Sequence, residues 1–369
     1  MQREQRMKAI IVSSSFSYLE RTELLREAYE EKGYDTTVIM TDFIHAGKKY
    51  VEEDKEGYLF VKTKPYYRNI SPQRLYSHYQ FAKDAFAKVR EYDVDLLHVL
   101  IPANSLAMEA DKYKKEHPNV KLYLDFIDLW PETMPINRFK NTFPFQIWKN
   151  LRNKNLERAD AIYCECDLYK EVLGVADDKR YKTLYWAKRS DGIESHPDLS
   201  EEHINLCYLG SINNIIDMDL IVEMCKAIGQ YKPVTLHIIG AGEKKEEFLQ
   251  LLKGNQVDVS DYGAVYDERE KQKIFDNCHF GLNIMKSTVC VGLTMKSLDY
   301  FRAQLPIINS INGDTTSFVN EYKIGFDDYR DFIEVINQLK IEDYLHMRKN
   351  VKKLYEEKFT KNAFMKQML

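Results

Sequence analysis

Short apolar runs alternate with helical segments along nearly the whole chain, and this alternation limits the possible folds more than any other feature. In the first half the runs are Met7–Ser13, Thr36–Met40, Tyr58–Lys62, Leu96–Ile101, Lys121–Ile127, Ala161–Glu165 and Thr183–Trp186. Segments with helical periodicity lie between them, among them 21–32, 72–91 and 145–157. Continuous apolar runs of this length are typical of parallel strands buried on both faces, and crossover helices join such strands. We therefore predict an α/β fold built on doubly wound parallel sheets.

The alternation stops at 188–203, a polar segment that carries Gly192, Ser195 and Pro197, and then resumes. The later runs are Ile204–Leu209, Val234–Ile239, Val257–Ser260, Phe280–Met285 and Pro306–Ser310. A length of 369 residues also exceeds that of a usual single domain. We predict two Rossmann-like domains facing a cleft, 1–187 and 204–351, with 188–203 as the linker. Beyond Asp343 the pattern is one amphipathic helix, and we expect its end, about 352–369, to return to the first domain.

Composition excludes several classes of protein. Lys plus Arg is 53 and Asp plus Glu is 57, and this near balance argues against a protein that coats nucleic acid. No apolar stretch reaches the length of a membrane span or of a signal sequence, so a cytoplasmic protein is expected. The six cysteines lack the spacing of metal ligands, and Asp217 and Asp219 begin a helix instead of following a strand. We predict buried thiols and no metal.

Ligands of open α/β sheets bind beyond the carboxyl ends of the strands, so the residues just after the apolar runs are the candidates for a site. In the first half these include Ser14, Ser15 and Asp128. In the second half they are Gly210, Ser211, Asn213, Gly240, Gly242, Val265, Tyr266, Lys286, Gly292, Leu293 and Thr294. Two glycine-bearing turns in one domain favour a ligand that carries phosphate, although ordinary strand-to-helix turns also need glycine.

The segment VGLTMKSLDYFRAQLPIINS gives the strongest local signal. Thr294 can cap a helix whose free N–H groups and positive dipole end suit a diphosphate. Lys296 lies in the first turn, where its charge opposes the dipole, and Asp299 lies on the same face. Either a ligand phosphate or Asp299 could compensate Lys296, and the second case is a simple ion pair within the helix.

Taken together, five blocks resemble the family-four glycosyltransferases of the GT-B fold that occur in bacterial surface-polysaccharide clusters. The blocks are DFIDLWPET, YLGSI, LHIIGAGE, YGAVYDERE and MKSLDYFRAQLPII, in the expected order. The resemblance implies transfer of a sugar, with retained anomeric configuration, from a nucleotide diphosphate sugar, without a metal or another cofactor. The implied acceptor is a saccharide or a polyprenyl-diphosphate-linked saccharide of capsule, exopolysaccharide or another cell-surface glycan.

The resemblance also implies roles for single residues. Asp299 would accept hydrogen bonds from the ribose, Gly210 and Ser211 would line the diphosphate, and Val265 with its neighbours would meet the base. Asp128 would lie on the acceptor side as a catalytic candidate; otherwise it is a cap or turn residue before Pro131.

The sequence departs from the family pattern at the positions that contact the donor phosphates in many members. Ser211 stands where many members carry Arg, and no Lys or Arg occurs in 210–225. Val291 replaces the earlier acid of the paired-acid motif. Positive charge must then come from Lys296, Lys286 and helix dipoles.

Two other functions stay open: an accessory sugar-binding partner with little activity, and a nucleotide-sugar epimerase of the same architecture. The epimerase would need histidines gathered in the cleft, whereas His45, His78, His98, His237 and His279 are scattered along the chain. The segment Val61–Tyr92 interleaves basic and aromatic residues. Three interpretations fit this pattern: a solvated helix with an aromatic core face, a patch that contacts the acceptor or the inner membrane surface, or a nucleic-acid site.

Overall fold

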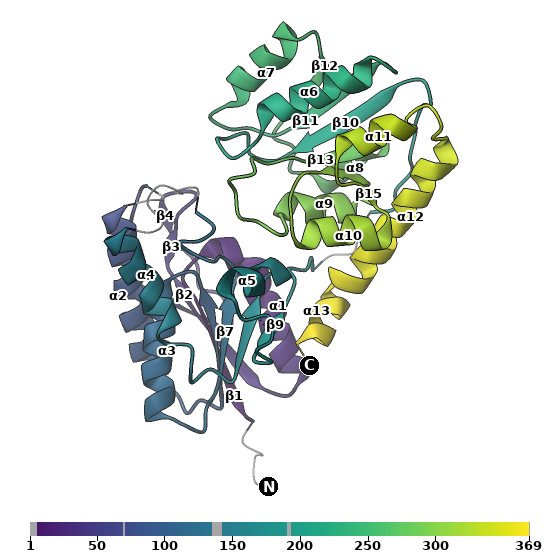
Figure 1. Cartoon of the computed structure of the whole chain (residues 1–369). Helices are drawn as coiled ribbons and strands as arrows, with labels where there is room; N and C mark the ends of the chain where they lie inside the picture. Colours follow the sequence, from purple (N-terminus) through teal and green to yellow (C-terminus); the bar gives the residue numbers. More distant parts are fainter. Residues whose placement is uncertain (1–5, 69–70, 135–141, 190–192, 369) are drawn as a thin grey trace. The chain divides into compact units, whose positions relative to one another are not determined.

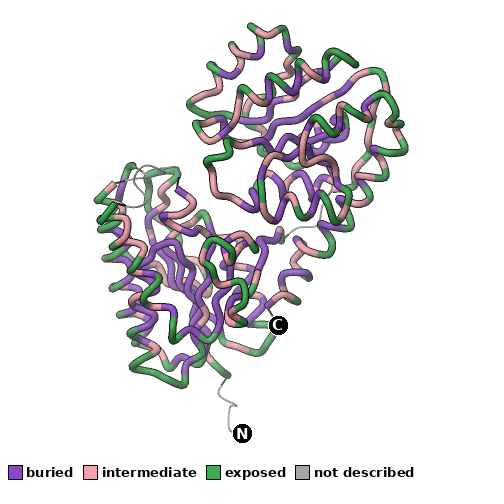
Figure 2. Tube along the Cα trace, in the orientation of Figure 1, coloured by how far each residue is buried: buried purple, intermediate pink, exposed green. Residues whose placement is uncertain are grey.

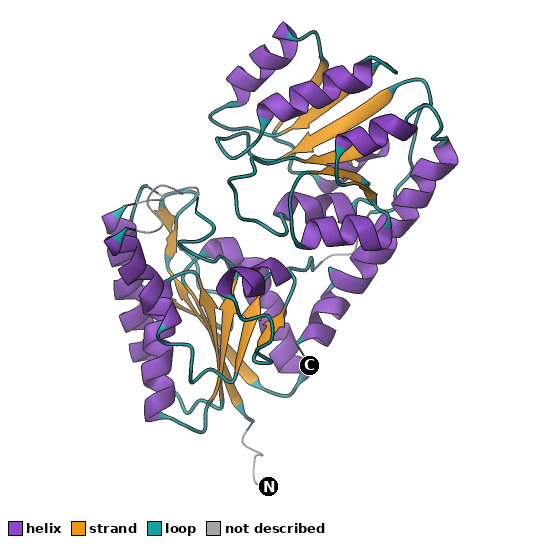
Figure 3. Cartoon of the chain, viewed as in Figure 1, coloured by secondary structure: helices purple, strands orange, loops and turns teal. Residues whose placement is uncertain are grey.

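Both halves of the chain fold as parallel sheets covered by helices, as the alternating pattern predicts (Figure 3). The computed structural model describes residues 6–68, 71–134, 142–189 and 193–368. It divides into two compact units. The first unit comprises Met1–Arg189 with Phe364–Leu369, and the second comprises Ser190–Ala363 (Figure 1).

The first unit is built on a seven-stranded sheet of order β5-β2-β1-β6-β7-β8-β9, in which all paired neighbours are parallel. Its strands are β1 (Lys8–Ser13), β2 (Asp35–Thr41), β5 (Tyr58–Val61), β6 (Leu96–Ile101), β7 (Lys121–Phe126), β8 (Ala161–Cys164) and β9 (Tyr181–Thr183). Helices α2 (Pro72–Val89), α3 (Asn104–Glu116) and α4 (Phe143–Asn153) cover one face, and α1 (Leu19–Glu31) and α5 (Asp167–Leu173) cover the other (Figure 1). Every residue of the central strand β6 is buried, and Figure 2 shows the inner strands of this unit mostly in the colour of buried residues. Cover on both faces explains why all residues of β6 except His98 are apolar.

The second unit is built on a six-stranded parallel sheet of order β12-β11-β10-β13-β14-β15. Its strands are β10 (Ile204–Leu209), β11 (Val234–Ile239), β12 (Asp258–Gly263), β13 (Phe280–Asn283), β14 (Ile307–Asn309) and β15 (Gly325–Phe326). Its helices are α6 (Met218–Gly229), α7 (Lys245–Gly254), α8 (Glu268–Asp276), α9 (Met295–Arg302), α10 (Asp314–Tyr322), α11 (Tyr329–Val335) and α12 (Ile341–Lys358). The prediction of two doubly wound units is confirmed.

In the ranges that the structure describes, three short strands are not predicted by the sequence pattern. They are β15 and the antiparallel pair β3 (Phe43–Ile44) and β4 (Lys49–Tyr50). Each has two residues, too few for a periodicity to appear.

The tail is two helices, and the expectation of one long helix is wrong. Helix α12 ends at Lys358, and α13 (Lys361–Gln367) follows. The side chain of Phe359 is fully buried at the break, and the Thr360 hydroxyl accepts a hydrogen bond from the Ala363 N–H (3.2 Å), which caps the new helix. The return to the first unit begins at Phe364.

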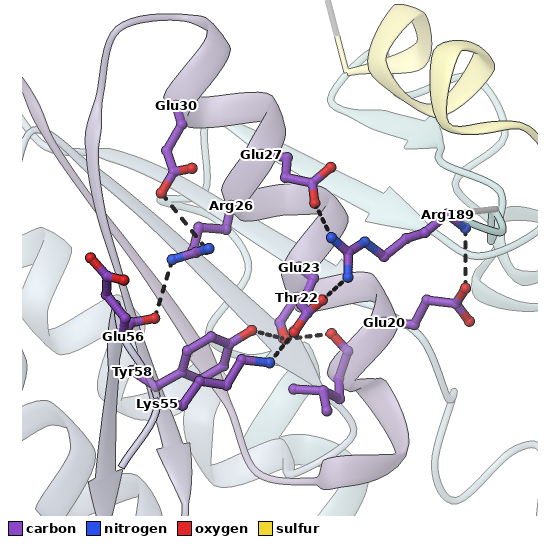
Figure 4. A network of polar contacts seen from close by, with 11 residues as sticks. Glu20, Thr22, Glu23, Arg26, Glu27, Glu30, Lys55, Glu56, Tyr58 and Arg189 are labelled. Carbon is purple, nitrogen blue, oxygen red and sulfur yellow. Dashed lines mark hydrogen bonds and ion pairs between the residues drawn. The ribbon is translucent and has the colours of Figure 1, made fainter.

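The two ends of the segment 188–203 are each held by their own unit, while 190–192 lie outside the described residues. In the first unit, Glu23 and Glu27 of α1 bind the Arg189 guanidinium, and Glu20 accepts from the Arg189 N–H (3.1 Å; Figure 4). In the second unit, the Asp276 carboxylate accepts from the Ser195 hydroxyl (2.7 Å) and the His196 N–H (3.0 Å). These acidic residues of α1 therefore hold the start of the linker segment through Arg189.

Candidate functional site

Each sheet has one point at which the strand order reverses, and such points are where open α/β sheets bind ligands. In the second unit this point lies between β10 and β13, and in the first unit between β1 and β6. The Lys286 N–H donates to the Ile215 carbonyl (3.0 Å), so the loops that follow β10 and β13 meet there. Candidates from these two loops are therefore neighbours in space.

The glycines after β10 and β11 hold two loops against each other. The Ile212 N–H donates to the Ala241 carbonyl (2.9 Å). A Cβ atom added at Gly240 would lie 2.0 Å from the Gly210 carbonyl oxygen, and one at Gly242 would lie 2.1 Å from that of Ile212. Gly210 differs, because a Cβ there would meet open space while its φ of +115° favours glycine. Gly240 and Gly242 therefore have a packing role, whereas Gly210 leaves room for a ligand.

We expect Gly240→Ala to destabilise the second unit by about 1–3 kcal/mol, because the added methyl group must push one loop off the other. Calorimetric unfolding measures the effect. All three tryptophans, Trp130, Trp148 and Trp186, belong to the first unit, so the fluorescence transition should stay in place. Gly254→Ala at the end of α7 is the matched control, since its Cβ would meet nothing within 4 Å. Equal stability of the two variants would contradict the packing role.

The N-terminus of α9 is organised as the sequence predicts. Thr294 is the N-cap, and its side-chain oxygen accepts from the Ser297 N–H (3.1 Å). The Thr294 hydroxyl in turn donates to Asn283 at the end of β13 (3.0 Å). Just before the helix, Leu293 is buried, and the Gly292 carbonyl accepts from the N–H of Thr315 (2.9 Å). These contacts fix the first turn of α9 rigidly at the switch point.

Lys296 lies in that first turn, and it does not pair with Asp299. Its ammonium nitrogen lies 4.4 Å from the centre of the Tyr208 ring and 3.4 Å from the Tyr208 hydroxyl oxygen. Within the described residues it forms no ion pair. Burial lowers the pKa of Lys296 to about 8. The ammonium is thus held by an aromatic face, with no described carboxylate to neutralise it.

Tyr208 is a residue of this site that the sequence did not indicate. It is the fifth residue of β10 and reads as part of an apolar strand, but its hydroxyl donates to the Ser211 carbonyl (2.9 Å). Tyr208 thereby joins Lys296 to the loop of Gly210 and Ser211. No local pattern reveals this, because the contact with Lys296 spans 88 residues of chain.

The other candidates of the second unit lie on α9 and on the loops after β10, β12 and β13. The Asn213 carboxamide accepts from the Ile215 N–H (3.1 Å) and shapes the loop after β10. Lys286 is exposed on the loop after β13, and Asp299 is half-buried on α9. Val265 and Tyr266 follow β12, and Tyr266 is 86% exposed.

In the first unit, the candidates gather at the carboxyl ends of β1 and β7. Ser14 is buried directly after β1, and Ser15 caps the short 3₁₀ helix Phe16–Tyr18 by accepting from the Ser17 N–H (3.2 Å). The Tyr18 hydroxyl at the end of that helix donates to Asp128, which follows β7. Asp128 does not cap a helix. Burial raises the pKa of Asp128, although the Tyr18 hydrogen bond and the Arg74 charge oppose this.

A cation and two aromatic rings stand beside this pair. The guanidinium of Arg74 on α2 lies 4.1 Å from the centre of the Trp130 ring, and the His78 ring stacks on Trp130 at 6.1 Å. Burial lowers the pKa of His78 to about 3, so its imidazole is neutral at physiological pH. The segment of Val61–Tyr92 thus contributes residues near the candidate Asp128, which its composition alone could not reveal.

The five histidines do not form one cluster. His98 is buried against Tyr29 and Asp125, and His279 is buried in the second unit, where its pKa falls to about 4 because of burial. His237 is half-buried beside the Tyr262 hydroxyl (2.9 Å), and His45 stacks on Tyr66. Among the described residues, no group of three or more His, Cys, Asp or Glu side chains could hold a metal ion. In the same ranges no helix is long and apolar enough to cross a bilayer.

No protein-family model and no curated protein matches this sequence. Solved structures do match. The lipopolysaccharide outer core galactosyltransferase WaaB aligns with a TM-score of 0.67 at 13% identity, covering 98% of each chain. HepE of Anabaena, solved with UDP and glucose, aligns with a TM-score of 0.66 at 13% identity, again over 98% of each chain. The N-terminal domain of trehalose-6-phosphate phosphatase of Candida albicans aligns with a TM-score of 0.69 at 12% identity, over 100% of this chain and 97% of that one.

These matches establish the architecture. The chain has the two-unit GT-B fold of glycosyltransferases such as WaaB and HepE. Identities of 12–13% carry the likeness no further than the fold. The function must therefore be argued from the residues.

Proposed function

We propose that this chain is a retaining glycosyltransferase that moves a sugar from a nucleotide diphosphate sugar to a saccharide or lipid-linked saccharide. The position of Lys296 carries the proposal. Its ammonium lacks a carboxylate partner among the described residues, and it lies in the first turn of α9, where the helix dipole is also positive. Two positive features at one strand-order switch point call for an anionic ligand.

A nucleoside diphosphate fits this arrangement. Lys296, the N–H groups after Thr294 and exposed Lys286 would bind the two phosphates beside Gly210 and Ser211. Asp299 would accept from the ribose, and Val265 and Tyr266 would meet the base. Departure of a nucleoside diphosphate develops negative charge, and fixed donors at that place stabilise it. We propose that these groups replace a metal. HepE, whose fold this chain shares, is solved with UDP and glucose, which supports a sugar nucleotide as the donor.

The test is incubation with a panel of nucleotide sugars and saccharide acceptors, with products followed by NMR. We expect release of nucleoside diphosphate and a product with retained anomeric configuration. A thermal-shift screen identifies the base first, because a ligand at 100 times its Kd stabilises by about 2.7 kcal/mol. Isomerised donor sugar would instead indicate an epimerase.

One observation favours a second candidate, a sugar-binding partner with little activity. The segment 210–225 contains no Lys or Arg, so few cations surround the proposed diphosphate. Binding of nucleotide sugar without hydrolysis or transfer, for every donor and acceptor, would decide for this candidate.

We further place the transfer in bacterial surface-polysaccharide synthesis, at the cytoplasmic face of the membrane. Helix α4 exposes Phe143 (78%) and Ile147 (48%). On α2, exposed Tyr76 and Tyr79 each lie under a lysine: the nitrogen of Lys64 is 4.7 Å from the Tyr76 ring centre, and that of Lys83 is 4.7 Å from the Tyr79 ring centre. Exposed aromatic residues paired with lysines suit the interface of an anionic membrane, where a polyprenyl-linked acceptor would lie.

We expect the protein to float with vesicles that contain anionic lipid and less with neutral vesicles, because lysine charge adds to aromatic burial. Replacing Phe143 and Ile147 with Ser should weaken binding by about tenfold or more. Val172→Ser is the matched control, since Val172 is an exposed apolar residue (40%) of α5 on the other face of the sheet. Equal flotation of all three proteins would contradict this surface.

A further inference from the structure

Tyr18 has no role in the proposed donor site, yet it makes a buried, specific contact with Asp128. The phenol comes from the 3₁₀ helix after β1, and Asp128 comes 110 residues later, after β7. The ring is 8% exposed and contacts Trp186 edge-to-face, with 6.2 Å between ring centres. Ser15 caps the short helix and so fixes the backbone from which the Tyr18 side chain extends. These contacts hold the phenol beside Asp128.

The contact with Tyr18 involves only one of the two carboxylate oxygens of Asp128. The Tyr18 hydroxyl donates to Oδ2 of Asp128. Within the described residues, Oδ1 has no hydrogen-bond partner, and Asp128 as a whole is half-buried. An anchored carboxylate with one open oxygen at the carboxyl edge of a parallel sheet can accept a hydrogen bond from a ligand hydroxyl.

We infer that Tyr18 is a positioning residue of the proposed transferase: it anchors Oδ2 of Asp128 so that Oδ1 receives the acceptor hydroxyl. The inference rests on the proposed function and adds to it a residue that holds the acceptor-side carboxylate. Asp128 is the group that touches the substrate, and Tyr18 acts through it.

Burial and the charges around the pair together determine its response to pH. The charge of Arg74 on α2 lowers the pKa of Asp128 and so favours its ionised form. The charge of Glu165, which follows β8, raises the pKa of Tyr18 and so favours its neutral form. Burial raises the pKa of Asp128, and the Tyr18 hydrogen bond lowers it. Removing the hydroxyl therefore raises the pKa of Asp128, so the carboxylate loses its charge at a higher pH.

The test is Tyr18→Phe, which keeps the ring against Trp186 and removes the hydroxyl. We expect kcat/KM for transfer to fall about tenfold at neutral pH, as for loss of a hydrogen bond to a charged group. The acidic limb of the pH profile should move to higher pH. Affinity for nucleoside diphosphate, which depends on the second unit, should stay within twofold. In an Asp128→Asn background, Tyr18→Phe should have no added effect.

Tyr29→Phe is the matched control. It removes another buried tyrosine hydroxyl of the first unit, the one that pairs with His98 (2.7 Å). It should lower stability without moving the pH profile. An active wild type whose pH profile Tyr18→Phe leaves unchanged would overturn the inference and leave the proposed function standing. A wild type that neither binds nucleoside diphosphate nor transfers a sugar would overturn both.

Discussion

An Arg21→Met variant is expected to lose roughly 3–5 kcal/mol of stability in the first unit, because it leaves a buried carboxylate without its cation. Arg21 and Asp125 are both fully buried and form two hydrogen bonds of 2.7 Å. The same guanidinium donates to the Leu184 carbonyl (3.0 Å) and lies 5.5 Å from the Phe364 ring centre. One side chain therefore joins α1, β7, the segment after β9 and the returning C-terminus.

The pH dependence of this loss has a definite sign. Burial alone would raise the pKa of Asp125, but Arg21 and His98 outweigh burial and hold it below its ordinary value. The pair thus stabilises the wild type above the ordinary pKa of Asp, and this contribution disappears as the pH falls through the lowered pKa. Without Arg21, burial raises the pKa of Asp125. The difference between wild type and variant should be largest at neutral pH and shrink in acid.

Urea unfolding followed by tryptophan fluorescence measures the effect, because all three tryptophans belong to the first unit. Arg26→Met is the matched control on the same helix. The side chain of its partner Glu30 is exposed, and the Arg26 nitrogen lies 3.7 Å from the Glu30 oxygen. We therefore expect a loss of stability below about 1 kcal/mol. The double variant Arg21→Met with Asp125→Leu should recover much of the stability, since no unpaired charge remains. A loss below about 1 kcal/mol for Arg21→Met alone would contradict the argument.

The architecture could be predicted because its signals are local. Strand β6 is apolar apart from His98 because both its faces are covered, and Thr294 occupies the N-cap that its position suggests. Positions after strands also pointed to Asp128 and to the loop of Gly210. These inferences need only the residues of one segment and a general rule of topology.

The partners could not be predicted, because they come from distant segments. Tyr18 looks like an aromatic residue in a loop until β1 and β7 are brought to one sheet edge. Gly240 and Gly210 look equivalent in the sequence, but Gly240 allows two loops to pack together, whereas Gly210 leaves open space. The tail read as one helix because Phe359 continues the apolar pattern across the break. Sequence periodicity predicts which residues are buried, but it does not predict which other segment covers them.

The largest effect on ligand binding is expected for Lys296→Met. Loss of a charged hydrogen bond to phosphate weakens binding by about 1.5–3 kcal/mol, which is about tenfold to somewhat more than a hundredfold. A nucleoside without phosphate should bind the variant and the wild type equally. Asp299→Ala should behave differently. If Asp299 binds the ribose, its loss weakens nucleoside and nucleoside diphosphate alike, by roughly 1–3 kcal/mol.

The lowered pKa of Lys296 adds a pH signature to this prediction. Burial brings the pKa from 10.5 to about 8 in the folded chain. The unfolded chain therefore binds more protons between these two values, and stability without ligand should rise with pH across this window. Binding of diphosphate has the opposite dependence, because it needs the protonated ammonium. Affinity should fall as the pH rises from about 7 to 9, and binding near pH 8 should take up protons.

Calorimetric titration with nucleoside and nucleoside diphosphate, at several pH values and in buffers of different ionisation enthalpy, measures both effects. Lys253→Met, an exposed lysine on α7 of the same unit, is the control for a change of net charge. The wild type and this control should show proton uptake and a falling affinity with pH, and Lys296→Met should show neither. If Lys296→Met weakened both ligands equally, or kept the pH dependence, the ammonium would not face the phosphates. The donor site would then have to be sought away from the first turn of α9.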